Sequence, residues 1–139
     1  MAEHTPLNRF IAALDTWGEE LYRRGFPVAP GSDGEPPQCV SAVEGFAPLE
    51  RQGVDLSLWL RSLGLPEAAD TLDAGVEEVR GWSWAYDEGG LETHAIDDEH
   101  GQIYREIDYV VEATQISCRA LRELDALLPT DIWDGFVDE

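Results

Sequence analysis

The stretch IYREIDYVVEATQISCRALRELDALL, residues 103–128, decides the fold class. Its apolar residues recur at spacings of three and four, which is the period of an α-helix. One stripe comprises Ile103, Ile107, Val110, Val111, Thr114, Cys118, Leu121 and Leu128. A second stripe beside it comprises Tyr109, Ala113, Ile116, Ala120, Leu124 and Leu127. A helix that is apolar over most of its circumference is expected at the centre of a helical domain.

Three further helices are predicted before this segment. Thr5-Pro6 fits an N-cap followed by a proline at the first helical position, and the apolar periodicity continues until Gly25. Asp55 fits the N-cap of a second helix. Pro66 fits the first position of a third. The sequence therefore predicts an all-α fold, a compact antiparallel bundle of about four helices around a long C-terminal helix.

The end of the third helix has two interpretations. Trp82, Trp84 and Tyr86 alternate with a period of two, which is typical of a strand. The turn-forming run DEGG at 87–90 then separates them from the segment Leu91 to Ile96. A small β-hairpin near 82–96 is therefore the alternative to a continued helix.

The whole chain, residues 1–139, is expected to form a single acidic helical domain. Residues 26–38 contain four prolines and two glycines, which neither a helix nor a central strand accommodates, so a long loop is predicted there. Leu128-Pro129 ends the last helix. The residues 129–139 then form a short acidic-aromatic tail, which either docks on the bundle or is free for a partner.

The charge is strongly one-sided. Asp and Glu number 29 against 9 cations, giving a net charge of -20, and every cation is arginine. Such a surface repels phosphate backbones and anionic lipids, so no direct nucleic-acid or membrane binding is expected. No apolar run approaches the roughly 20 residues of a membrane span. Cys39 and Cys118 are far apart and no leader segment opens the chain, so a cytoplasmic location is predicted.

Residues with catalytic or metal-binding chemistry are few. The densest group of candidate metal ligands is His94, Asp97, Asp98, Glu99 and His100. No second group matches it, and acids in the first turn of a helix explain it better. Cys118 falls on the apolar stripe, and no glycine-rich phosphate loop is present. We therefore expect no catalytic residue, no metal, no cofactor and no enzymatic activity.

One acid lies close to the apolar stripe of the final helix. Asp125 is placed between Leu121 and Leu128, and a carboxylate buried there needs a partner. Arg122 is near enough in sequence to be that partner. Fraying near the helix end is the simpler explanation.

The candidate partner-binding residues combine aromatic and acidic side chains. They are Trp82, Trp84, Tyr86, Asp87, Glu88, Glu92, Asp97, Asp98, Glu99, Asp131, Trp133 and Asp134. Aromatic anchors ringed by carboxylates suit a partner rich in Arg and Lys, through cation-π contacts and charge-assisted hydrogen bonds. The alternative is that the aromatics pack inside and the acids only keep the protein in solution.

The leading functional hypothesis is an acidic protein-binding module that inhibits or neutralises a basic, nucleic-acid-binding partner. An immunity protein, an antitoxin and a DNA-mimicking inhibitor are forms of this function. One alternative is a metal-binding helical-bundle enzyme or sensor that uses His94, His100 and nearby acids. Another is an acidic housekeeping or structural domain of a salt-adapted host. The oligomeric state and the partner's identity stay open.

Overall fold

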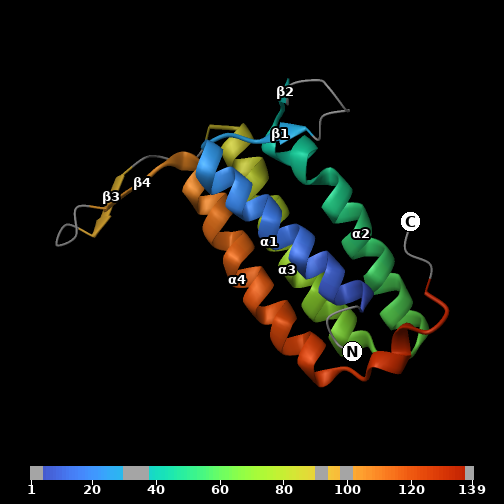
Figure 1. The fold of residues 1–139 in the computed structure, drawn as a ribbon. Coiled ribbons are helices and arrows are strands. Elements are labelled where there is room, and N and C mark those ends of the chain that lie inside the picture. Colours follow the sequence, from blue (N-terminus) through green and yellow to red (C-terminus); the bar gives the residue numbers. More distant parts are fainter. Residues whose placement is uncertain (1–4, 30–37, 90–93, 98–101, 137–139) are drawn as a thin grey trace.

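The fold is an all-α bundle, as predicted (Figure 1). The computed structural model describes residues 5–29, 38–89, 94–97 and 102–136. The helices are α1 (Pro6–Arg24), α2 (Ala42–Ser62), α3 (Pro66–Asp87), α4 (Glu106–Leu127) and the short 3-10 helix η2 (Thr130–Trp133). Two short antiparallel strand pairs join β1 (Val28–Ala29) to β2 (Gln38–Cys39) and β3 (His94–Asp97) to β4 (Gln102–Tyr104).

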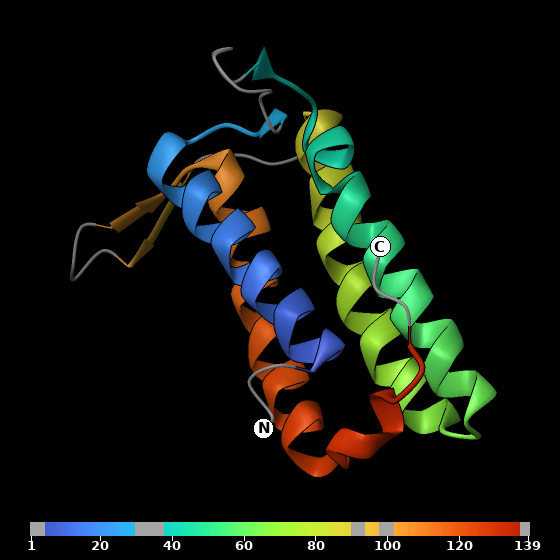
Figure 2. The same cartoon turned by 45° about the vertical axis from the view of Figure 1, so that its right-hand side comes forward.

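Successive helices run in opposite directions, and the bundle has no central member. α4 packs against α1 on one side and α3 on the other, and α2 packs mainly against α3. Figure 2 shows the α1–α4 pair and the α2–α3 pair as two layers. Because α2, α3 and α4 contain 21, 22 and 22 residues, α4 is also not distinguished by its length. A bundle built around a long C-terminal helix is thus not what the structure shows.

Only one of the two apolar stripes of α4 is buried. From Ile107 to Leu121 the first stripe is at most 4% exposed. In the second stripe Ala113 is buried, but Ile116 is 51% exposed and Leu127 is 81% exposed. The expectation that α4 is covered on most sides is therefore wrong. Among the described residues it has helical neighbours on two sides only, so much of the second stripe stays exposed.

α2 begins much earlier than the predicted N-cap at Asp55. Ser41 is the actual N-cap, and its hydroxyl accepts a hydrogen bond from the backbone N–H of Glu44. The helix continues through Pro48, although a proline inside a helix costs about 3 kcal/mol. Burial of Phe46 and Leu49, at 1% and 8% exposure, offsets that cost. Asp55 is an exposed residue in the middle of the helix.

α3 extends through the aromatic residues that suggested a hairpin. Its N-terminus at Pro66 matches the prediction, and its buried face includes Leu72 and Val79. The helix ends at Asp87, just before Gly89 with a φ of 71°. A hairpin near 82–96 is therefore not shown, because the first half of that range is helical and the antiparallel pair β3–β4 overlaps it only at residues 94–96.

The main core fills the space between all four helices. Its largest fully buried side chains include Phe46, Leu7, Ile11, Leu14, Leu60, Leu72 and Leu121. A smaller cluster of Leu21, Ile107, Val110 and Val111 closes the end where α1 finishes and α4 begins. The predicted loop at 26–38 lies mostly outside the described residues.

Candidate partner-binding surface

The aromatic residues of α3 lie on two different faces. Residues two apart in a helix are separated by about 200° around the axis, so Trp82 and Trp84 point in opposite directions. Trp82 is half-buried and stacks on Tyr109 of α4, with ring centroids 5.7 Å apart. Its indole N–H donates to Glu78 at 2.9 Å. Tyr86 packs beside Trp82, whereas Trp84 is 60% exposed.

The two acids that follow these aromatics differ in their surroundings. The carboxylate of Asp87 accepts hydrogen bonds from the backbone N–H groups of Ala42 at 2.7 Å and Val43 at 3.0 Å. It satisfies two of the four N–H groups that every helix leaves open at its start. Glu88 is exposed and forms no such contact among the described residues. Asp87 therefore has a structural role, and Glu88 is available to a partner.

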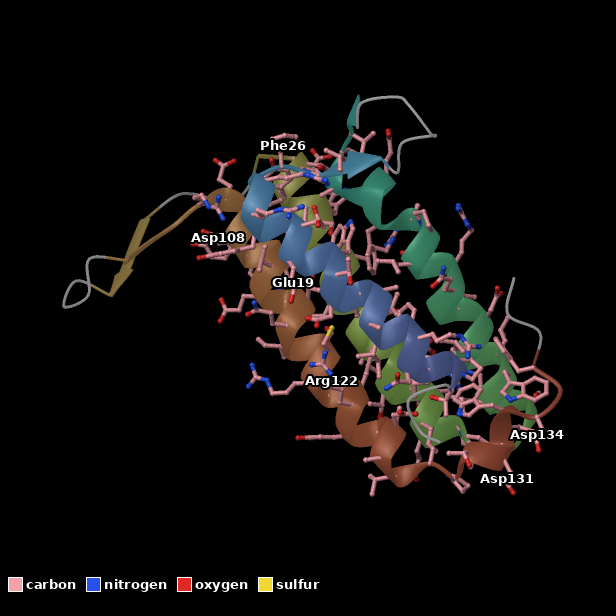
Figure 3. The ribbon with its side chains drawn as sticks, in the orientation of Figure 1. Glu19, Phe26, Asp108, Arg122, Asp131 and Asp134 are labelled. Carbon is pink, nitrogen blue, oxygen red and sulfur yellow. The ribbon has the colours of Figure 1, made fainter. Side chains whose placement is uncertain are left out.

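The C-terminal tail docks on the bundle. Trp133 is 6% exposed and belongs to the main core. The indole N–H of Trp59 donates to the carbonyl of Ile132 at 2.8 Å, and Phe136 meets the Trp59 ring edge-on at 5.6 Å. Asp131 and Asp134 remain exposed at this end of the molecule (Figure 3). The tail thus keeps two carboxylates at the surface, while its tryptophan belongs to the core.

Part of the predicted site lies outside the described residues. This applies to Glu92, Asp98 and Glu99, to His100, and to the side chains of Asp97, His94 and Cys39. Within the described ranges no three His, Cys, Asp or Glu side chains gather in an arrangement that could hold a metal ion. The proposed metal ligands at His94 and His100 therefore stay a prediction.

Arginine is largely committed to ion pairs inside the molecule. Within the described residues, at least six of the nine arginines form them: Arg23 and Arg24 with Glu20, Arg61 with Asp70 and Asp73, Arg80 with Glu50, Arg105 with Asp108, and Arg122 with Asp15. Many exposed acids make no ion pair within the described part of the chain. They include Glu19, Glu44, Asp55, Glu67, Glu77, Glu88, Glu112, Glu123, Asp131 and Asp134. The acidic surface is therefore mostly uncompensated.

The Arg105–Asp108 ion pair lies where the end of α1 meets the start of α4. Burial acts to raise the pKa of Asp108, but hydrogen bonds and charge from Arg105 outweigh it and hold that pKa below its usual value. Arg105 also donates to the carbonyl of Tyr22 at 2.9 Å and lies over its ring. This arginine ties the end of α1 to the start of α4, so its charge is internally compensated.

The buried acid of α4 has a different partner from the one expected. Asp125 is 7% exposed and accepts a hydrogen bond at 3.1 Å from the hydroxyl of Thr5, the N-cap of α1. Arg122 instead pairs with Asp15. The suggested Arg122–Asp125 pair is therefore wrong. Asp125 is buried, whereas Arg122 is exposed and faces α1 at the surface. Fraying is also excluded, since α4 continues to Leu127.

Cys118 is a core residue, as its position on the apolar stripe predicted. Its side chain is 1% exposed and its sulfur approaches the carbonyl oxygen of Ile11 at 3.8 Å. Burial, with a smaller contribution from Asp15, raises the pKa of the thiol to about 11. A thiol of this kind stays protonated and is a poor nucleophile at neutral pH.

The structure adds a surface that the sequence analysis did not single out. Ile116, Ala120, Leu124 and Leu127 form a row along the α3 side of α4, and all but Leu124 are exposed. The row leads from the Trp82–Tyr109 stack to an open pocket of about 490 Å³ that Leu124 lines together with the start of α3. The signal was present as the second apolar stripe of α4, which we interpreted as core.

Comparison with known proteins finds no matching family model, no matching curated protein and no matching solved structure. In the part of the chain that the structure describes, no helix combines the length and apolar character needed to cross a membrane. The function is therefore argued from the geometry and charge of this chain.

Proposed function

We propose that this protein is an acidic binding module that inhibits or neutralises a basic macromolecular partner, one that itself binds nucleic acid. The observation that carries the proposal is the commitment of six arginines to internal ion pairs. It leaves exposed acids on α3, α4 and the tail, among them Glu77, Glu112 and Asp134, without counter-charges from the described chain. The net charge of the chain is -20, and these exposed acids contribute to it.

A surface of this kind favours basic partners for two reasons. Its long-range potential accelerates encounter with a positively charged protein. At contact, carboxylates form charge-assisted hydrogen bonds with guanidinium and ammonium groups. The same surface repels nucleic acid, so the module would compete with nucleic acid for a basic site instead of binding beside it.

The proposed partner class follows from this competition. A nucleic-acid-binding protein carries its cations where phosphates bind, at intervals of about 3.4 Å along each strand. Carboxylates on rigid helices can occupy those positions in place of phosphates. An immunity protein, an antitoxin and a DNA mimic are the forms of inhibitor that we propose, and the cytoplasm is the proposed location.

Affinity capture tests the proposal. The immobilised protein is exposed to a nuclease-treated lysate of the producing cells at about 50 mM salt, and each captured protein is identified and purified. We expect a basic protein that loses its nucleic-acid binding when the acidic module is added in equimolar amount. A captured partner that is acidic, or one whose nucleic-acid binding is unchanged, would contradict the proposal.

Salt adaptation of the host is the competing explanation for the acidity. It predicts that the protein folds only at molar salt, because like-charge repulsion then needs screening. The binding module should instead be folded in dilute buffer, since its main core is built from fully buried side chains such as Leu7 and Leu72. Circular dichroism across a salt series separates the two explanations.

A further inference from the structure

We infer that the exposed face where α4 borders α3 is the docking surface, and that its occupant is a basic amphipathic helix of the partner. This inference rests on the proposed function and names the surface and the partner chemistry through which it would act. The α3–α4 face is defined by the apolar row Ile116, Ala120, Leu124 and Leu127 and by the Trp82–Tyr109 stack at its upper end.

The apolar row is the first argument. Ile116 and Leu127 are 51% and 81% exposed, although they continue the helical spacing that begins at the buried Ala113. Their positions, with Ala120 between them, keep one direction along α4 over several turns. A contiguous apolar strip of this kind on a protein surface marks a site of interaction.

The packing of α3 and α4 beside the row is the second argument. α3 and α4 approach closely where both carry small residues: Ser117 donates to the carbonyl of Gly75 at 3.1 Å. Larger side chains stand at either end, with the Trp82–Tyr109 stack above and Leu124 below. The lower end opens into the pocket of about 490 Å³ beside Leu65 and Thr71. From Tyr109 to Leu127 the strip is about 27 Å long, which matches a helix of about 18 residues.

The charges on the rim select the occupant. Glu67 lines the pocket, Glu78 lies beside Trp82, and Glu112 and Glu123 are exposed on α4. Carboxylates of α3 and of α4 therefore flank the row. A helix with one row of leucines and arginines elsewhere would place apolar side chains on the strip and guanidinium groups at the edges. A second copy of this chain would bring -20 of like charge to the interface, so the charge disfavours self-association.

A designed peptide tests the inference. The probe has about 18 residues, with leucines at helical spacing and arginines between them, and its control has the same composition in an order that breaks the apolar row. Binding is followed by amide chemical shifts of the labelled full-length protein. Two double variants are compared. One is Ile116→Ser with Leu127→Ser on α4, and its control is Val54→Ser with Leu58→Ser, which are also exposed apolar residues, on α2.

The expected result is a set of shifts confined to α3 and α4, and an affinity reduced on the order of tenfold or more by the α4 variant alone. The scrambled peptide should bind more weakly than the probe. Equal binding of both peptides, or a loss of affinity in the α2 variant instead, would contradict docking on the α3–α4 face and would leave the proposed function intact. Absence of probe binding would also contradict docking on this face. The proposed function is tested separately, by the capture experiment.

Discussion

The carboxylate of Asp87, the last residue of α3, holds the backbone N–H of Ala42, the first residue of α2, at 2.7 Å. The second oxygen takes the N–H of Val43. Together with the hydroxyl of Ser41, this carboxylate caps α2 from another helix and closes the end of the α2–α3 pair. The negative charge also lies at the positive end of the α2 dipole, which strengthens the contact.

Replacing Asp87 should therefore destabilise the fold. We expect Asp87→Ala to lower the free energy of unfolding by about 1–2 kcal/mol, since two backbone donors lose their partner. Glu88→Ala is the matched control, because Glu88 is exposed and caps nothing in the described chain. Urea denaturation measures both. Equal stability of the two variants would show that the Asp87 cap contributes little.

Two glycines should respond in opposite ways to alanine. A Cβ on Gly53 would lie 2.7 Å from Cγ2 of Val76 and 3.4 Å from Cζ of Phe10, whereas a Cβ on Gly81 meets nothing within 4 Å. Gly53→Ala should cost about 1–3 kcal/mol by overpacking the contact between α2 and α3. Gly81→Ala should stabilise the protein by about 0.5–1 kcal/mol through helix propensity. Thermal unfolding distinguishes them, and a stabilising Gly53→Ala would contradict the packing described.

The thiol of Cys118 should be unreactive in the folded protein. In a Cys39→Ser background, alkylation by iodoacetamide at pH 8 should be slow in buffer and fast in urea. Burial raises the pKa of this thiol to about 11 in the folded protein, against about 8.5 in the unfolded chain. The contribution of Cys118 to the free energy of unfolding should therefore be fully present below about pH 8.5 and be lost as the pH rises toward about 11, because the unfolded chain ionises first. Rapid alkylation of the folded protein at pH 8 would contradict the burial of this residue.

Helical periodicity predicted the bundle because tertiary packing follows the same spacing. The stripes from Leu72 to Val79 and from Ile107 to Leu121 are buried as expected. The prediction failed for the first half of α2, where a residue that disfavours helix by its own propensity lies in a helix stabilised by tertiary packing. Pro48 is a helix breaker by propensity, but it lies inside α2 because the flanking apolar residues are in the core.

The candidate site was only partly accessible to sequence reasoning. The period-two spacing places Trp82 and Trp84 on the same face of a strand. In a helix the two side chains point in opposite directions, and only the structure shows that Trp82 is the one that faces α4. Burial of Trp133 and the cap formed by Asp87 depend on residues far away in sequence. The apolar row on α4 was visible, but its exposure depends on how many neighbours the helix has.

The salt dependence of partner binding tests the central claim most directly. Calorimetry with the captured and purified partner at about 50 and 200 mM salt gives the slope of log Kd against log salt. The account predicts a strong loss of affinity at the higher salt, because uncompensated acids such as Glu77 and Glu112 face the partner's cations. An affinity that does not change between the two salt concentrations would contradict it.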